Sequence, residues 1–148
     1  MSGSLHYIDS KIVEDIYGTW RFSSIYGWPE GSEKWRTWDL IRSLAGQWDG
    51  PWLCGGDFNQ VRTNDEKVGG NNPSVAEMDS FNDCLMEVGM QDLGYIGYKF
   101  TWENSRRHGG YIEEVLDRFI RSDAWRDKFR NARVLHLDKL RLDHSPIV

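Results

Sequence analysis

Asp57 and Asn59 are the residues of this sequence best placed to do chemistry. They follow the apolar residues 52–54 and two glycines, a pattern that indicates a buried strand with an abrupt end. Ligands of open α/β sheets bind outside the carboxyl ends of the strands, so a carboxylate and an amide two residues apart are expected to face a shared cleft. The alternative is a turn in which both side chains bond their own backbone.

Four further polar residues stand at positions that suit a site. Asp143 and His144 are neighbours just before the end of the chain, and Asp117 interrupts an apolar segment, where an unpaired carboxylate would be costly. Tyr26 ends another predicted strand. Each has a structural alternative as well: Asp117 can pair with a neighbouring arginine, Asp143 can be a turn residue, and Tyr26 can lie at the rim of the core.

The elements that must position these residues alternate between strands and helices, which indicates an α/β fold. The predicted strands cover residues 11–16, 20–26, 52–56, 98–103, 114–120 and 134–137. Apolar residues at helical spacing predict a helix over 33–48 with Ser32 as its N-cap. A second helix begins at the capping box of Ser74 and Glu77 and ends at Gly89, and Ser122 caps a short third helix. The polar, glycine-containing residues 61–72 predict a surface loop beside the cleft, and the strands 98–103 and 114–120 predict a hairpin with a basic tip.

Composition favours one domain inside the cell. The chain of 148 residues can bury a real core and has no internal repeat or linker. It contains no apolar run of about 18 residues, and residues 1–6 lack the features of a secretory signal. Cys54 and Cys84 are expected to be free buried thiols without a disulfide partner, since one lies on a predicted strand and the other on a helix.

Charge is distributed unevenly along the chain. The net charge of −5 opposes nonspecific attraction of the whole chain to nucleic acid. Residues 1–98 carry 7 basic and 15 acidic side chains, whereas residues 99–148 carry 11 basic and 8 acidic ones. The carboxyl-terminal third could therefore face a polyanion such as DNA, and the alternative is that its basic residues are ordinary solvated surface.

Five short motifs follow one another in an order that resembles the endonuclease/exonuclease/phosphatase family. They are Tyr26-Gly27-x-Pro29, Gly56-Asp57-Phe58-Asn59, Phe100-Thr101-Trp102, Leu116-Asp117-Arg118 and Asp143-His144-Ser145-Pro146-Ile147. The sequence is most similar to the apurinic-endonuclease-like domain of plant non-LTR (LINE-type) retrotransposons, over residues 8–148. The resemblance implies a four-layer α/β sandwich that cleaves phosphodiesters or phosphomonoesters, with DNA as the partner of the intact domain.

The resemblance also implies roles for the candidate residues. Asp57 and Asn59 would act on the attacking water and the phosphate, and His144 would stabilise a phosphoryl oxygen. Asp117 would orient His144, and Tyr26 would contact the phosphate. Such roles agree with the needs of hydrolysis at phosphorus, which requires an oriented water, a base and positive charge near the equatorial oxygens.

The cofactor implied is Mg²⁺ or Mn²⁺, with Asp143 holding the metal or its water. Hard oxygen ligands suit Mg²⁺. The family pattern also has an upstream asparagine and a metal-binding glutamate in a Gln-Glu-Thr-like context, and neither occurs here. Leu142 stands where the family usually has serine, and Val115 where a basic residue is common. Metal binding by this chain is therefore in doubt.

We therefore expect residues 1–148 to be a single, amino-terminally truncated domain: a partial sandwich with little activity alone. A second hypothesis is a noncatalytic nucleic-acid-binding or interaction module that uses Arg106 and Arg107 at the hairpin tip. A third is a phosphatase of the same family. The sequence does not indicate an oligomeric state.

Overall fold

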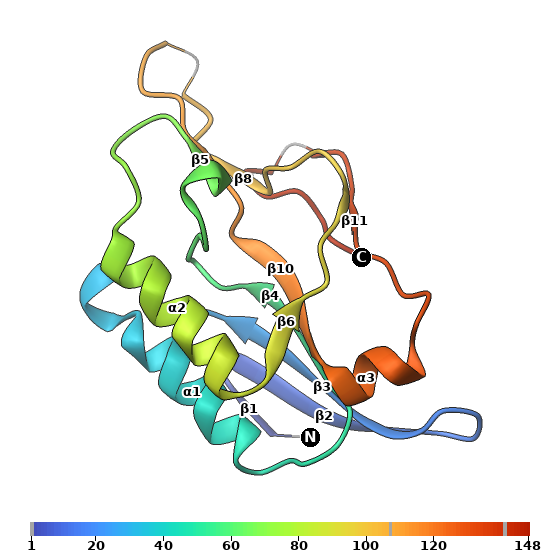
Figure 1. Ribbon diagram of the computed structural model, residues 1–148. Helices are drawn as coiled ribbons and strands as arrows, with labels where there is room; N and C mark the ends of the chain where they lie inside the picture. The colour runs from blue at the N-terminus through green and yellow to red at the C-terminus, as the bar shows by residue number, and fades with distance from the viewer. Residues whose placement is uncertain (1, 107, 141) are drawn as a thin grey trace.

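A mixed six-stranded sheet forms the centre of the molecule in the computed structural model, which describes residues 2–106, 108–140 and 142–148 (Figure 1). Its strand order is β1-β2-β3-β4-β10-β6. The strands are β1 (Ser2–Ser4), β2 (Tyr7–Glu14), β3 (Gly18–Tyr26), β4 (Trp52–Asp57), β10 (Asp117–Ser122) and β6 (Met90–Asp92). β3 and β4 are parallel, and every other neighbouring pair in this sheet is antiparallel.

Two helices cover one face of this sheet. α1 (Trp35–Ala45) and α2 (Val75–Glu87) lie side by side (Figure 1). The short α3 (Asp123–Lys128) directly follows the carboxyl end of β10. α1 connects β3 to β4, because parallel neighbours need a crossover rather than a tight turn. Two 3₁₀ turns, η1 (Gly31–Glu33) and η2 (Asn64–Glu66), complete the helical segments that the structure describes.

Two small sheets lie beyond the end of β4. One contains β5 (Lys67–Val68), β9 (Glu113–Glu114) and β8 (Trp102–Glu103) in the order β5-β9-β8. The other pairs β7 (Ile96–Gly97) with β11 (Leu135–His136) in parallel. The predicted hairpin is therefore confirmed at β8 and β9, whose connection projects at the top of Figure 1. Arg106 belongs to its tip, and Arg107 lies outside the described residues.

The main core fills the space between the helices and the sheet. The predicted stripes of both helices contribute to it, since Trp38, Ile41, Phe81 and Leu85 are all buried. Trp38 stacks on Phe81 with ring centroids 4.5 Å apart. Burying a large apolar side chain stabilises the fold by about 1.5–3 kcal/mol, so this layer fixes the helices on the sheet. Cys54 and Cys84 lie in the same core as free thiols, as expected.

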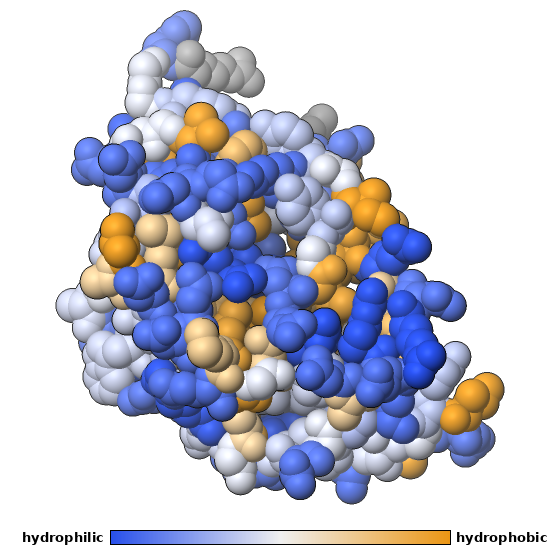
Figure 2. All heavy atoms as spheres, in the orientation of Figure 1, coloured by the Kyte–Doolittle hydropathy of each residue, from blue (hydrophilic) through white to orange (hydrophobic). Residues whose placement is uncertain are grey.

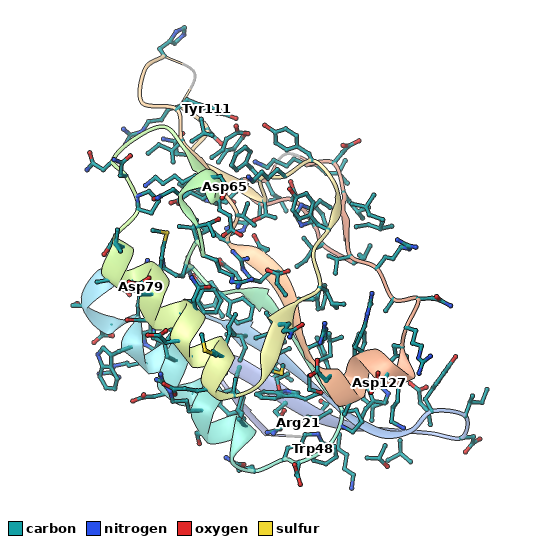
Figure 3. The ribbon with its side chains drawn as sticks, viewed as in Figure 1. Arg21, Trp48, Asp65, Asp79, Tyr111 and Asp127 are labelled. Atoms are coloured by element: carbon teal, nitrogen blue, oxygen red, sulfur yellow. The ribbon has the colours of Figure 1, made fainter. Side chains whose placement is uncertain are left out.

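Arg21 on β3 is a charged residue that is buried near the apolar core (Figure 3). Its Nε donates to Asp9 Oδ1 at 2.7 Å and its Nη2 to Asp9 Oδ2 at 2.9 Å. Its Nη1 donates to the Leu44 carbonyl oxygen at 2.6 Å. A buried guanidinium needs such partners because its desolvation is costly. This side chain therefore ties β2 and β3 to the end of α1.

Local predictions differ from the structure at the start of the first helix. Residues 31–33 form η1, and α1 begins at Trp35 with Lys34 as an N-cap that makes no side-chain cap hydrogen bond. The prediction of Ser32 as the N-cap is therefore wrong, because this serine lies inside the 3₁₀ turn. Ser74 and Ser122 are confirmed, since they accept from the backbone N–H groups of Glu77 and Trp125.

Several predicted strands have other boundaries. The strand predicted over residues 11–16 is β2, which covers Tyr7–Glu14, and the predicted loop 61–72 contains η2 and β5. Of residues 98–103 only 102 and 103 are in a strand, and 134–137 contribute only β11. The predicted strand 114–120 divides into β9 and β10, which belong to two different sheets. Because the predicted strand is divided, Asp117 is the first residue of β10, and this places it at the candidate site.

Candidate active site

The end of β4 is fixed by two glycines that leave no room for a side chain. A Cβ at Gly56 would lie 2.2 Å from the Ile25 carbonyl oxygen, and the residue has φ +136. A Cβ at Gly55 would lie 2.3 Å from the ring of Phe119. Only glycine allows this close approach of neighbouring strands. Asp57 is therefore held at a defined position at the strand end.

Asp57 and Asn59 form the turn that the structural alternative predicted, and they also face the cleft. The Asn59 backbone N–H donates to Asp57 Oδ1 at 2.8 Å, which is an Asx turn. Asn59 adopts φ 51, and its Nδ2 donates to the Gly27 carbonyl oxygen at 2.8 Å. Because these contacts use Oδ1 of the aspartate and Nδ2 of the asparagine, Asp57 Oδ2 and Asn59 Oδ1 are left for other partners.

Thr101 joins the segments that carry Asp117 and His144. Its Oγ1 accepts hydrogen bonds from the backbone N–H groups of Leu116 and Asp117, both at 3.0 Å. Its carbonyl oxygen accepts from the Ser145 N–H at 2.6 Å. These bonds bend the chain between β9 and β10, so that Asp117 starts β10 instead of lying within a continuous strand.

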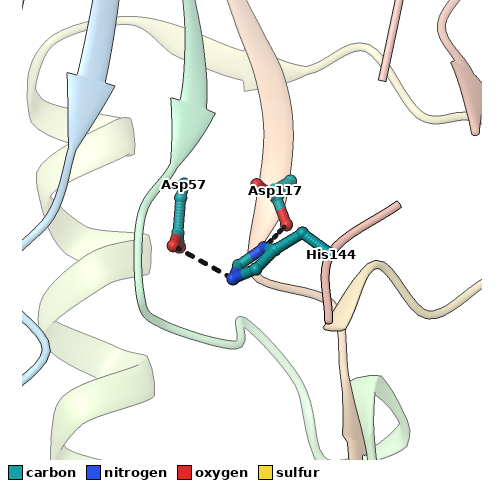
Figure 4. Close-up of side chains that lie close together, drawn as sticks. All are labelled: Asp57, Asp117 and His144. Carbon is teal, nitrogen blue, oxygen red and sulfur yellow. Dashed lines mark hydrogen bonds and ion pairs between the residues drawn. The ribbon is translucent and has the colours of Figure 1, made fainter. Parts of the chain in front are cut away.

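His144 lies between two carboxylates (Figure 4). Its Nδ1 is 2.8 Å from Asp117 Oδ2, and its Nε2 is 3.8 Å from Asp57 Oδ2. Asp117 thus pairs with this histidine and, within the residues that the structure describes, not with an arginine. The hydrogen bond fixes the ring so that Nε2 faces Asp57.

Tyr26 and Asp143 complete the group that the sequence predicted. Tyr26, Asp57 and Asp117 are register partners across β3, β4 and β10, and the tyrosine is half exposed. Tyr26, Asp57, Asn59, Asp143 and His144 all line one cavity of about 540 Å³. Asp117 is not part of the cavity wall but forms a hydrogen bond with His144, which is. All six predicted site residues are therefore brought together, while their individual roles remain predictions.

Burial and neighbouring charges shift the pKa values of two of these groups. Burial, with the nearby Asp117 carboxylate, raises the pKa of Asp57 to about 6 from a usual value of 3.8. The hydrogen bond with Asp117 raises the pKa of His144 above its usual value of 6.5. A carboxyl with a pKa of about 6 can take up a proton near neutral pH, and an imidazole whose protonated form Asp117 favours can donate one.

The donor atoms of the site suit a hard divalent cation. Asp57 Oδ2, Asn59 Oδ1 and the exposed Asp143 are oxygen donors at the same cavity. One ligand atom each from Asp57, Asp117 and His144 lie within 4.8 Å of one another, but Asp117 is already engaged by His144. Mg²⁺ is usually held by one or two carboxylates and keeps several waters, so Asp57 and Asp143 can provide such a site.

Other residues of the cavity were not singled out from the sequence. Lys34 and Gln60 lie on one part of the wall, where Lys34 Nζ donates to Gln60 Oε1 at 2.8 Å. Lys67, Glu77 and Glu114 lie on the wall as well. Nothing in their local sequence indicates a site, because tertiary packing alone brings them to the cleft.

Comparisons of fold find similar solved structures, whereas comparisons of sequence find nothing. No protein-family model matches the chain, and no curated protein matches it. The endonuclease domain of TRAS1, a telomere-specific non-LTR retrotransposon, is similar in structure with a TM-score of 0.72 and 19% identity over 96% of this chain and 61% of that chain.

Two further solved structures are similar in fold. The 3′ phosphatase NExo from Neisseria, bound to a product DNA hairpin, has a TM-score of 0.69 and 16% identity over 93% of this chain and 62% of that chain. A double mutant of beta toxin from Staphylococcus aureus, with bound magnesium ions, has a TM-score of 0.55 and 14% identity over 96% of this chain and 52% of that chain.

The structural neighbours are endonuclease/exonuclease/phosphatase-fold proteins, and the mixed α/β architecture of this chain is consistent with their sandwich fold. The chain spans less than two thirds of the length of each of the three. None of the helices in the described part of the chain is long and apolar enough to cross a membrane.

Proposed function

We propose that this cleft hydrolyses phosphate esters, with the phosphodiesters of DNA as its substrate. The observation that carries the proposal is the convergence of Asp57, Asp117 and His144 from separate segments, with one ligand atom of each within 4.8 Å of the others, at the cavity that Asp57 and His144 line. Supporting it, one neighbour is an endonuclease domain and another a 3′ phosphatase bound to DNA.

Each side chain has a chemical role in this proposal. Asp57 Oδ2 accepts a proton from the attacking water, which Asn59 Oδ1 helps to orient, and its pKa of about 6 suits a base near neutral pH. His144, whose protonated form the hydrogen bond with Asp117 favours, donates from Nε2 to a phosphoryl oxygen as negative charge develops there. Tyr26 contacts the phosphate from the cleft wall.

Asp143 would hold a divalent cation, Mg²⁺ or Mn²⁺, or its water. When bound, such a cation neutralises charge on the phosphate oxygens. A single protein carboxylate is a sparse ligand set. We propose that the chain is part of an endonuclease/exonuclease/phosphatase domain and that it acts inside the cell. Without the glutamate and asparagine of the family pattern, its activity alone is weak.

Cleavage of DNA under single-turnover conditions tests this function. A duplex with one abasic site, incubated with excess protein and Mg²⁺, should be cut slowly by the wild-type chain. Asp57→Ala and His144→Ala should each slow the cleavage by about a hundredfold or more. Equal cleavage by the wild type and both variants would contradict the assignment, and fast cleavage by the wild type would contradict the claim of weak activity.

A phosphatase is the second candidate, favoured by the likeness to the 3′ phosphatase. Release of inorganic phosphate from a 3′-phosphorylated oligonucleotide, without strand cleavage, would support it. The noncatalytic alternative uses the basic hairpin tip with Arg106. It predicts DNA binding that weakens steeply with salt and that Asp57→Ala leaves intact.

A further inference from the structure

We propose that Lys67 binds a phosphate oxygen of the substrate and so positions the ester in the cleft, an inference that rests on the proposed function. Lys67 begins β5 and lines the cavity that holds Asp57 and His144. A lysine ammonium is compact and has three donors, which makes it a common phosphate ligand.

The residue before Lys67 is anchored in the protein. Glu66 accepts from Arg118, whose Nη2 is 2.7 Å from Oε2 and whose side chain is 3% exposed. The Arg62 backbone N–H donates to Glu66 Oε2 at 2.6 Å, and the Val115 N–H donates to the Glu66 carbonyl oxygen at 2.9 Å. Because the side chain and backbone of Glu66 are both held, Lys67 is presented to the cavity at a fixed position.

The Lys67 ammonium keeps donors for a ligand. Its nearest carboxylate within the described residues is Glu114, with Nζ 3.4 Å from Oε1. A charge-assisted N–H···O bond is usually about 2.7–2.9 Å long. By contrast, Lys34 Nζ donates to Gln60 at 2.8 Å and to Glu77 at 3.3 Å. Lys67 therefore has weaker internal partners than the other lysine of the cavity.

The setting strengthens an interaction of Lys67 with an anion. Its side chain is only 17% exposed, and charges interact more strongly where water is displaced. The carboxylates on the cavity wall, which are Asp57, Glu77, Glu114 and Asp143, would otherwise repel a phosphate. Figure 2 shows the mixed polar and apolar surface in the same orientation as Figure 1. Lys67 offsets these carboxylates and so favours an anion in its part of the cavity.

Titration with inorganic phosphate, without added metal and without turnover, tests the proposal. Lys67→Ala should bind phosphate about tenfold more weakly than the wild type, which corresponds to about 1.4 kcal/mol. Lys11→Ala is the matched control, because Lys11 is exposed on β2, away from the cavity, and the change in net charge is the same. Circular dichroism verifies the folding of each variant.

A second variant tests the same idea in the opposite direction. Glu114→Gln removes the partner of Lys67 and should strengthen phosphate binding several-fold. The control Glu33→Gln also removes the carboxylate of an ion pair, with Arg36, but lies outside the cavity and should not strengthen binding. If phosphate does not bind the wild type, or binds equally to the wild type, Lys67→Ala and Glu114→Gln, the role of Lys67 is wrong. These results do not depend on hydrolysis, so an inactive wild type would contradict the proposed function alone.

Discussion

The two carboxylate oxygens of Asp57 have different partners, one in the turn and one in the cleft. Oδ1 accepts from the Asn59 N–H, and Oδ2 faces the His144 ring. The turn of the structural alternative is therefore present, and the residue also lines the cleft, while its catalytic role stays a prediction. An ionised carboxylate in this place is costly because it is largely buried and close to a second carboxylate, Asp117.

Asp57→Asn should stabilise the protein at neutral pH. The pKa of about 6 in the folded protein lies above the usual 3.8, so stability is lost as pH rises from about 4 to 6 and the carboxyl ionises. At about 1.4 kcal/mol per pKa unit the cost at pH 7.5 is on the order of 3 kcal/mol. Urea denaturation should show a small difference between variant and wild type at pH 4 and a gain of about 2–3 kcal/mol for the variant at pH 7.5. A variant less stable at pH 7.5 would contradict this account.

The Asp117 hydrogen bond should be visible in the titration of His144. Its pKa is raised in the folded protein, so the pair stabilises the fold below pH 6.5, and this contribution is lost as pH rises through the raised value. NMR titration of the ring should give a lower pKa for His144 in Asp117→Asn than in the wild type. Asp123→Asn, an exposed change, is the control. An unchanged His144 pKa in Asp117→Asn would show that the hydrogen bond does not form.

The bend between β9 and β10 is the structural element on which the site depends. Residues 114–120 have the composition of one strand, but two of their N–H groups bond to Thr101, which is distant in sequence. Such a bond is not visible in the local pattern, so the division into two sheets could not be predicted. Ser74 and Ser122 could be predicted as caps because a cap bonds within three residues, whereas Ser32 failed because a 3₁₀ turn precedes α1.

Thr101→Val tests the importance of this bend. Thr101 is 0% exposed. Valine has a similar shape but cannot accept hydrogen bonds from the backbone N–H groups of Leu116 and Asp117. Two unsatisfied donors should cost about 2–4 kcal/mol of unfolding free energy. The control is Ser80→Ala, whose hydroxyl bonds the Ala76 carbonyl oxygen on an exposed face and should change stability by less than about 0.5 kcal/mol. Equal effects of the two substitutions in chemical denaturation would contradict the role of Thr101.

The two faces of the central sheet differ across the whole molecule. Ile25, Cys54 and Ile120 point toward α1 and α2 and are buried, whereas Phe22 and Phe119 point to the other face and are only partly buried. The chain also spans only 61% of the TRAS1 endonuclease domain. The α/β class and the convergence of the site could be predicted from the sequence, because ordered motifs carry this information. How the second face is covered is a property of long-range packing that the motifs do not encode.

Alanine substitutions at two adjacent residues of β10 compare the faces directly. Ile120→Ala removes a side chain that is 0% exposed and should cost about 2–5 kcal/mol. Phe119→Ala removes a larger side chain but should cost less, because its ring is only partly buried. Guanidinium denaturation of both variants provides the comparison. A greater loss for Phe119→Ala would show that the second face is as well packed as the first.

The central claim is that Asp57 and His144 act as one unit on a phosphate ester. A double-mutant cycle measures it: single-turnover cleavage of abasic-site DNA with Mg²⁺ by the wild type, Asp57→Ala, His144→Ala and the double variant. Groups that act together are strongly non-additive, so we predict that each single variant loses nearly as much rate as the double variant. Additive losses, or cleavage unaffected by either substitution, would contradict the claim.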